Sequence, residues 1–266
     1  MPIKRNIPNA MTSGNLLCGC LAIIKVFEGD LVWAAYLVGI AAVLDFFDGF
    51  VARLLKVSSP LGKDLDSLAD MVTFGVVPGM VMYKLIINAI VLSNSNEILE
   101  YISDRPSSLG EIWSAANLTV KTASYLPYIS LLIPLFSCIR LAIFNNDTRQ
   151  SDVFIGVPTP ANGIFIVSLP VAAEFMKMDS ISAIGIGNPW VLAVICCVMS
   201  FLLVAPIRMI ALKFKSFKWK GNEIRFSFLI FSVILFAFLQ LLAVPLIIIS
   251  YVLFSIINNM VVKPTE

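Results

Sequence analysis

The sequence contains no histidine, and only 14% of its 266 residues are charged. The absence of histidine excludes Ser-His-Asp hydrolysis, zinc held by imidazole and proton transfer through histidine. Because imidazole ligands are absent, any bound metal is expected to be a hard cation held by oxygen ligands. A net charge of +2 is too small to indicate a protein that binds nucleic acid. The five cysteines all fall within apolar runs, which favours small buried hydrophobic residues over disulfides or a metal cluster.

Hydrophobic residues make up 59% of the chain, and its mean hydropathy is +0.91. A helix needs about 20 apolar residues to cross a bilayer. We therefore predict an all-α polytopic membrane protein, with apolar segments at 10–27, 31–55, 66–92, 123–144, 160–177, 188–212, 225–240 and 242–259. The last two segments are separated only around Gln240, so a hairpin is preferred and one long tilted helix is the alternative.

Two polar intervals suggest how the chain is oriented in the membrane. The interval 93–121 is acidic, whereas 213–225 carries four lysines and one arginine against a single glutamate. Since Lys and Arg are in excess in cytoplasmic loops, eight spans that begin inside at Lys4 place the basic loops inside and the acidic one outside. We expect an integral protein of the bacterial inner (cytoplasmic) membrane, with both termini cytoplasmic.

Ionisable residues gather in one apolar region, "LDFFDGFVARLLKVSSPLGKDLDSLADMVTFG", which begins at Leu44. At about 100° per residue, one helix face carries Asp45, Asp48, Gly49 and Ala52. One stripe of the following helix carries Gly62, Asp66 and Asp70. A short turn joins the two helices, so they are expected to be antiparallel neighbours with opposed acidic faces.

Four carboxylates around one small volume would repel one another without a cation. Mg²⁺ or Mn²⁺, as one or two ions, is the simplest way to offset that repulsion. Ionisable residues within a membrane are functional by default, which favours a metal site over carboxylates solvated at a helix end. Asp64 lies off the stripe and is interpreted as a solvated carboxylate.

The spacing of these residues resembles the signature of the CDP-alcohol phosphatidyltransferase family. The pattern is D-x-x-DG-x-x-AR, eight residues, then G-x-x-x-D-x-x-x-D, and every defined position is present between Asp45 and Asp70. The resemblance implies a six-helix core in which two metal ions bind the diphosphate of a CDP-linked lipid. It assigns the metal site to Asp45, Asp48, Asp66 and Asp70. It also makes Asp70 the general base, which takes the proton of the attacking hydroxyl.

The resemblance covers the first six helices and divides the chain into three parts. These are a catalytic transmembrane core at 1–212, a basic cytoplasmic loop at 213–225 and a C-terminal transmembrane hairpin at 226–266. The residues expected to face the nucleotide and its diphosphate are Asn9, Thr12, Asn15, Gly49, Ala52, Arg53 and Gly62. The family also implies a homodimer. Gly75 and Gly79 form a small-residue face that is interpreted as helix or dimer packing.

Further stretches resemble the phosphatidylserine synthase branch of this family. They are "DMVTFGVVP" from Asp70, "CIRLAIFNN" around Arg140, "FIGVPTPANG" from Phe154 and the opening "IPNAMTSGNLLCG". This branch implies CDP-diacylglycerol and L-serine as substrates. Arg140 and Arg208 are candidates for a pocket that holds the serine carboxylate or a phosphate, since each is a guanidinium at the end of an apolar span.

Two alternatives remain open from the sequence. The same chemistry with glycerol 3-phosphate or inositol phosphate as acceptor would be expected to need a denser basic cluster beside the metals. A divalent-cation transporter would often show two matched halves with sites at the membrane midplane. Here the acidic residues lie on two adjacent segments only, which favours the transferase.

Overall fold

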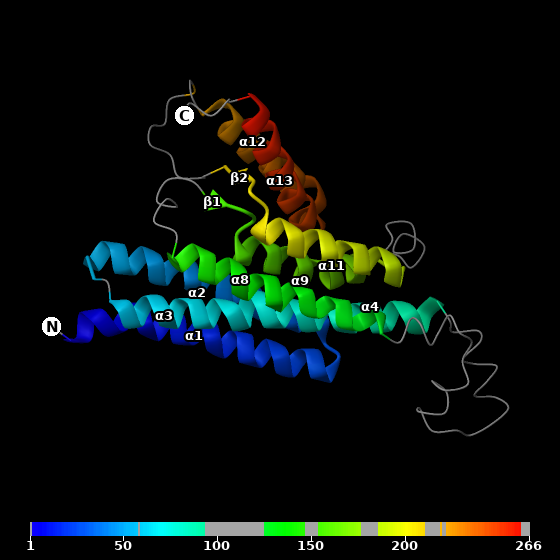
Figure 1. Ribbon diagram of the computed structural model, residues 1–266, viewed down its shortest axis with the longest axis horizontal. Coiled ribbons are helices and arrows are strands. Elements are labelled where there is room, and N and C mark those ends of the chain that lie inside the picture. Colours follow the sequence, from blue (N-terminus) through cyan, green and yellow to red (C-terminus); the bar gives the residue numbers. More distant parts are fainter. Residues whose placement is uncertain are drawn as a thin grey trace.

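The computed structural model describes residues 2–57, 59–93, 125–146, 154–176, 186–210, 219 and 222–261. Within these ranges the protein is a bundle of long helices with one pair of two-residue strands (Figure 1). Residues 94–121 of the acidic interval and most of the basic loop at 213–225 lie outside the described residues. The division of the chain into three parts therefore stays a prediction.

The first two helices form a tightly packed antiparallel pair. α1 spans Pro2–Glu28 and α2 spans Leu31–Leu55. Gly29 turns the chain between them at a φ of +86°, and Asp30 caps α2 by accepting a hydrogen bond from the Trp33 amide at 3.0 Å. Small side chains allow helices to approach closely in a membrane, and several on these two helices are fully buried: Ala22, Ala34, Val38 and Ala41.

The third span is one continuous helix with an irregular middle. α3 spans Pro60–Asp70, the π-helical segment η1 spans Met71–Val76 and α4 spans Val77–Ser93. Ser59 caps the start, where its hydroxyl accepts a hydrogen bond from the Gly62 amide at 3.0 Å. π-Helical turns within α-helices are frequent at functional sites, and this one begins immediately after Asp70.

The fourth span packs against the small residues of the third. It consists of η2 (Leu126–Leu131) and α8 (Leu132–Asn146). A Cβ added at Gly79 would lie 2.8 Å from Cδ of Pro134, and one at Gly75 would lie 3.1 Å from Cβ of Ser137. The small-residue face of the third span therefore packs against another helix of the same chain. Of the two interpretations made from the sequence, helix packing and dimer packing, this contact is the first.

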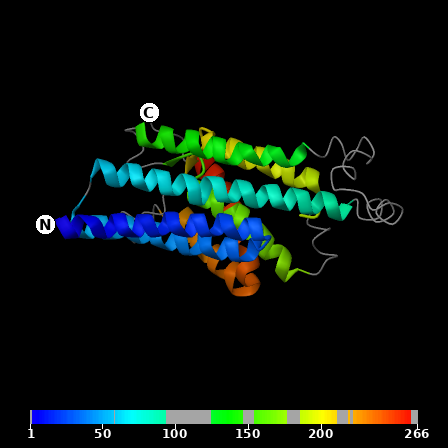
Figure 2. The ribbon, with the colours of Figure 1, turned by 90° about the horizontal axis from the view of Figure 1, so that it is seen from below.

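α9 (Thr159–Phe175) occupies the middle of the bundle and is its most buried helix. It contacts α2, α4 and η1, and α11 (Pro189–Val204) contacts α8 and α4 on the other side. Seen from below, α1 and α2 form one side of the bundle, α8 and α11 the other, and the third span runs between them (Figure 2). The hydrophobic core lies where these helices meet, around Phe74, Met82 and Ile166.

Two short strands join the loops that follow α8 and α11. β1 (Phe154–Ile155) pairs antiparallel with β2 (Arg208–Met209), with Ile155 opposite Arg208. The predicted span at 188–212 is therefore wrong at its end. Its helix stops at Val204, and the next residues are extended, because the chain leaves the bundle to pair with β1.

The last two helices form a hairpin, as preferred from the sequence. α12 spans Glu223–Leu239, η4 spans Gln240–Leu242 and α13 spans Ala243–Val261. Gln240 breaks the helix at a φ of +49°, and the rings of Phe228 and Tyr251 meet at 5.7 Å across the pair. The hairpin stands at a steep angle to the other helices in Figure 1.

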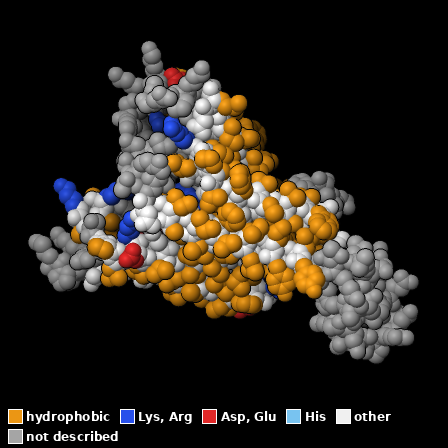
Figure 3. Space-filling model, viewed as in Figure 1, with side chains coloured by type: hydrophobic (Ala, Val, Ile, Leu, Met, Phe, Trp, Pro, Cys, Tyr) orange, Lys and Arg blue, Asp and Glu red, His pale blue; other side chains and the backbone are white. Residues whose placement is uncertain are grey.

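The surface of the described residues is that of an integral membrane protein. Five helical segments are long and apolar enough to span a bilayer: Asn6–Glu28, Leu31–Leu55, Pro60–Ser93, Leu126–Asn146 and Glu223–Met260, the last of which includes both helices of the hairpin. Hydrophobic side chains cover most of the face in Figure 3, and Lys and Arg gather toward one end and beside the hairpin. The eight predicted segments all correspond to helices, and most of their limits differ by only a few residues.

The Gly79 contact gives a test of the packing. Gly79→Ala should lower the free energy of unfolding by about 1–3 kcal/mol, because the Pro134 ring cannot move away from the new methyl group. Gly39→Ala is the matched control, because a Cβ there meets nothing within 4 Å and alanine is the better helix former. Unfolding in mixed detergent measures both variants. Equal stability of the two would contradict this packing.

Candidate metal and nucleotide site

Three of the predicted aspartates form a cluster that suits a divalent cation. Carboxylate oxygens of Asp45, Asp48 and Asp66 all lie within 4.8 Å of one another. Mg²⁺ and Ca²⁺ take oxygen ligands at about 2.0–2.6 Å, so oxygens on opposite sides of one ion lie about 4–5 Å apart. The donor set is purely oxygen, as a hard cation prefers. These residues therefore fit a divalent ion such as Mg²⁺ or Mn²⁺.

Asp70 lies one turn deeper in the bundle than this cluster. Its carboxylate is buried and accepts a hydrogen bond from Nδ2 of Asn15 at 3.3 Å. It also lies within hydrogen-bonding range of Asp45, which in turn reaches Asp66. The structure thus brings all four aspartates of the motif together, from α2 on one side and α3 on the other.

The two acidic helices meet through these side chains and not through close backbone packing. α2 packs mainly on α1 and α9, while α1 also contacts α3. The two helices are therefore neighbours through their acidic side chains, and α1 packs against both of them. This arrangement leaves an opening between α2 and α3 at the end of the bundle, which we call the aspartate end.

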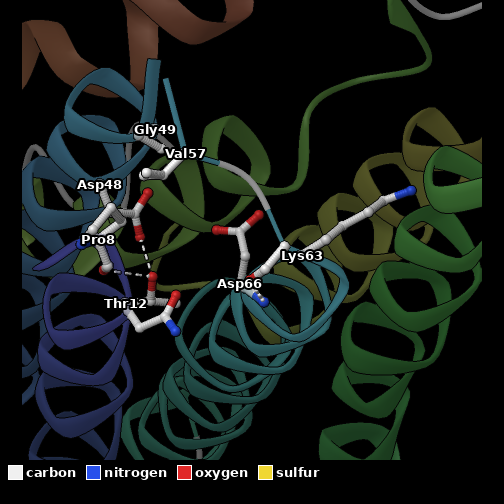
Figure 4. A pocket seen from close by; sticks show the side chains of 11 residues that line it. Pro8, Thr12, Asp48, Gly49, Val57, Lys63 and Asp66 are labelled. Atoms are coloured by element: carbon white, nitrogen blue, oxygen red, sulfur yellow. Dashed lines mark hydrogen bonds between the residues drawn. The ribbon is translucent and has the colours of Figure 1, made fainter. Parts of the chain in front are cut away.

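α1 supplies polar groups that orient the carboxylates. Oγ1 of Thr12 lies 2.6 Å from Oδ2 of Asp48 and 3.1 Å from the carbonyl oxygen of Pro8, a contact drawn in Figure 4. One turn on, Asn15 holds Asp70, and the Thr73 hydroxyl donates to the carbonyl oxygen of Asn15 at 3.3 Å. The polar stripe on the first helix therefore contacts the acidic residues directly.

A cavity of about 260 Å³ opens beside the cluster. It is lined by residues of α1, α2, α3 and the turn between α2 and α3: Pro8, Asn9, Thr12, Asp48, Gly49, Ala52, Val57, Ser59, Gly62, Lys63 and Asp66. In Figure 4, Asp48 and Asp66 face each other across it, and Lys63 extends away toward α8. Nζ of Lys63 donates to the carbonyl oxygen of Asn145 at 2.9 Å.

Most of the residues predicted to face the nucleotide line this cavity. Asn9, Thr12, Gly49, Ala52 and Gly62 do so. At Gly62 a side chain would crowd the wall, since a Cβ there would lie 3.1 Å from Oδ1 of Asn9.

Two predicted residues lie elsewhere. Asn15 is buried against Asp70, below the cavity, and Arg53 is exposed and is not among the residues that line it. The position of Arg53 follows from its helix, since it is offset by about 100° from Ala52, which does line the cavity.

Comparison with known proteins agrees with this geometry. The family model for CDP-alcohol phosphatidyltransferases matches residues 5–146, more than half of the chain and all four aspartates. The chain belongs to the CDP-alcohol phosphatidyltransferase family.

Several curated relatives carry one name, CDP-diacylglycerol–serine O-phosphatidyltransferase. The protein of that name from Bacillus subtilis is 32% identical over 82% of this chain and 94% of its own length. The Helicobacter pylori protein (strain J99) is 33% identical over 60% of this chain and 55% of its own. The Methanocaldococcus jannaschii protein is 27% identical over 68% of each.

Of the two arginines that the sequence linked to the acceptor, only one is inside the phosphatidyltransferase bundle. Arg140 on α8 is buried, and its guanidinium carbon lies 5.2 Å from the centre of the Phe144 ring. Its Nε has no hydrogen-bond partner among the described residues. A buried guanidinium with a vacant donor is able to bind an anionic ligand.

Arg208 is placed differently from what the sequence predicted. It lies on β2 and not at the end of a spanning helix, and its side chain is exposed. This correction has the same cause as the early end of α11, since extended pairing with β1 replaces the last helical turns.

Sequence reasoning missed several residues of this region. Lys63, Val57 and Ser59 line the cavity, and the Ser59–Pro60 pair is a recognisable helix start that could have been used to place it. Asn162 is fully buried on α9, and its amide nitrogen and oxygen have no partner within the described ranges. No sequence signal identifies an amide of this kind, because its burial depends on the helices around α9.

The Thr12 contact is tested by substitution. Thr12→Val keeps the volume but removes the hydroxyl that orients Asp48, and loss of such a partner typically lowers metal affinity about 10–100-fold. Titration of Mn²⁺ into the purified protein, followed by electron paramagnetic resonance, measures the affinity. Ser13→Ala is the control, since that hydroxyl bonds only to the Asn9 carbonyl of its own helix. An unchanged affinity in Thr12→Val would show that Asp48 needs no such support.

Proposed function

We propose that this chain transfers the phosphatidyl group of CDP-diacylglycerol to the hydroxyl of L-serine, giving phosphatidylserine and CMP. The observation that carries the proposal is the meeting of four aspartates of α2 and α3 beside a cavity, in a chain of this family. The name shared by the curated relatives supports serine as the acceptor and CDP-diacylglycerol as the donor.

Each part of the site has a role in this reaction. Asp45, Asp48 and Asp66, with Asp70 at their inner side, would hold one or two Mg²⁺ or Mn²⁺ ions. Such ions supply charge neutralisation of the diphosphate and of the departing CMP. Asn9, Gly49, Ala52 and Gly62 form a cavity wall of small and polar groups that suits the nucleotide.

The chain's own residues carry the proton transfer. The serine oxygen attacks the phosphorus that bears diacylglycerol, the bond from that phosphorus to the CMP oxygen breaks, and the hydroxyl proton passes to Asp70. A hydroxyl is a poor nucleophile until a base takes its proton during the attack. Asn15 holds Asp70 in place through the hydrogen bond to Oδ1.

The scarcity of cations beside the aspartates favours serine over a phosphorylated acceptor. Lys63 is the single cation among the described residues that line the adjoining cavity, and its Nζ is directed to the Asn145 carbonyl. A dianionic acceptor such as glycerol 3-phosphate or inositol phosphate would gain from several cations here, whereas serine carries no net charge. Arg140, whose Nε has no partner within the described ranges, is our candidate for the serine carboxylate. Arg208 is a weaker candidate, because its side chain is exposed.

Charge also supports a cytoplasmic position for the site in the inner membrane. Exposed basic residues lie at the aspartate end, among them Arg53, Lys56 and Lys63, whereas Asp30 and Glu174 lie together at the far end. The proposal of a homodimer rests on membership of the family, because Gly75 and Gly79 pack against residues of the same chain.

The function is tested by measuring CMP release. Purified protein is incubated with CDP-diacylglycerol, Mg²⁺ or Mn²⁺, and serine, glycerol 3-phosphate or inositol phosphate in turn. We expect CMP and phosphatidylserine with serine only, no turnover in excess chelator and recovery when either metal is restored. Turnover with a phosphorylated acceptor would show that the enzyme transfers the phosphatidyl group to an alcohol other than serine. Full turnover in chelator would exclude the metal-dependent mechanism.

The base is tested separately. Asp70→Asn keeps the size of the side chain and one oxygen ligand but removes the proton acceptor, and loss of a general base typically lowers the rate about 10²–10⁴-fold. We expect this variant to bind CDP-diacylglycerol with metal and to release CMP very slowly.

Binding and turnover are measured on the same preparation, with Asp64→Asn as control, since Asp64 is exposed and does not line the cavity. If binding is lost together with turnover, Asp70 is chiefly a metal ligand. If turnover stays near that of the wild type, the base is another residue.

A further inference from the structure

One face of α13 carries three polar residues spaced by four, and each hydrogen-bonds to the extended segment around β2. The Tyr251 hydroxyl donates to the carbonyl oxygen of Ile210 at 3.0 Å. The Ser255 hydroxyl accepts from the amide of the same residue at 3.1 Å. Nδ2 of Asn259 donates to the carbonyl oxygen of Arg208 at 2.9 Å. This polar ladder of Tyr251, Ser255 and Asn259 fixes the backbone of residues 208–210.

A small apolar cluster joins the same elements a second time. Met209 of β2 and Val252 of α13 are buried against Val157, which lies just before α9. Ala161, in the first turn of α9, packs against this cluster together with Ile256 of α13. The last helix therefore contacts both β2 and the beginning of α9.

The strand pair links the segment held by α13 to the beginning of α9. The amide of Gly156, next to β1, donates to the carbonyl oxygen of Ile207 at 2.8 Å, and the amide of Val157 donates to that of Leu202 at 2.9 Å. Gly156 has a φ of +76° and its Cα faces the Leu203 carbonyl, so no residue with a side chain fits there without strain. α9 then begins at Thr159 in a fixed position.

The beginning of α9 lies against the span that carries Asp70. A Cβ added at Gly163 would lie 3.0 Å from Cα of Phe74, which is one turn beyond Asp70. The neighbouring Asn162 is fully buried, and within the described ranges its amide has no partner. The part of α9 held by α13 thus carries unpaired polar atoms close to the catalytic span.

We propose that α13 positions the acceptor side of the active site. Through its polar ladder it holds β2 with Arg208 and, through the strand pair, the first turns of α9 with Asn162. This inference rests on the proposed transfer to an alcohol. The described residues that line the cavity come from α1, α2, α3 and the turn between α2 and α3, and none of them belongs to α9, β2 or α13. Loss of the ladder should therefore affect the acceptor and leave the nucleotide-linked donor unaffected.

The kinetic test uses the full-length protein in detergent or lipid nanodiscs. Tyr251→Phe and Asn259→Ala each remove one hydrogen bond to the segment around β2. Ser255→Ala removes the bond from the Ile210 amide and also the bond from Ser255 to the Tyr251 carbonyl of its own helix. One hydrogen bond typically corresponds to about two- to tenfold in an equilibrium constant. We expect the KM for serine to rise by about that factor in each variant and further in the triple variant. kcat and the KM for CDP-diacylglycerol should stay within about twofold of the wild type. Ser255→Thr, which keeps a hydroxyl, should restore the KM for serine.

A structural measurement separates positioning from general damage. Ser255→Ala removes the acceptor of the Ile210 amide, so hydrogen exchange at this amide should become faster while α1 to α3 exchange as in the wild type. Ser250→Ala is the matched control on the same helix, since its hydroxyl bonds to the Leu246 carbonyl of α13 itself.

Three results would overturn the proposal. They are an unchanged KM for serine despite faster exchange at Ile210, a parallel loss in both KM values and kcat, and the same change in Ser250→Ala. If the wild type uses another alcohol, the proposed acceptor is wrong, and the KM for that alcohol then tests α13 in the same way.

Discussion

Mutual repulsion among four carboxylates is the constraint on which the rest of this structure depends. Two like charges 4 Å apart repel by about 4 kcal/mol at the effective dielectric constant of a partly buried site. Carboxylate oxygens of Asp45, Asp48 and Asp66 lie within 4.8 Å of one another, close to that distance, and Asp70 follows one turn deeper. An apolar bundle tolerates this arrangement when cations and hydrogen-bond donors offset the repulsion. The polar face of α1 supplies donors from Thr12 and Asn15.

Helix packing around the site follows from the need to bring these groups together. α1 lies along both acidic helices, so its side chains reach Asp48 on one and Asp70 on the other. The π-helical turn after Asp70 and the close contacts of Gly75 and Gly79 set the third span against α8. The cavity opens at the aspartate end, where α1 packs against both acidic helices and all three line it.

Away from the site, the C-terminal hairpin supplies hydrogen-bond partners to an extended backbone segment. The segment after α11 is extended, so its amides and carbonyls lack the partners that a helix would give them. Near a bilayer such groups need partners from the protein itself. β1 and the polar ladder of α13 supply them to residues 207–210. The same hydrogen bonds that satisfy these amides and carbonyls also hold the beginning of α9 beside the third span.

The sequence by itself determined the spans, the family and the four aspartates, because hydropathy and helical periodicity are local properties of the chain. It placed α2 at its observed limits and put Asp66 and Asp70 on one stripe. Only the tertiary structure decided that Thr12 and Asn15 hold carboxylates, that Arg53 faces away from the cavity and that α11 ends at Val204. These features depend on contacts between helices far apart in the chain. The vacant amide of Asn162 and the ladder on α13 are of the same kind, since a polar residue in an apolar helix has a partner, or lacks one, only after the bundle has formed.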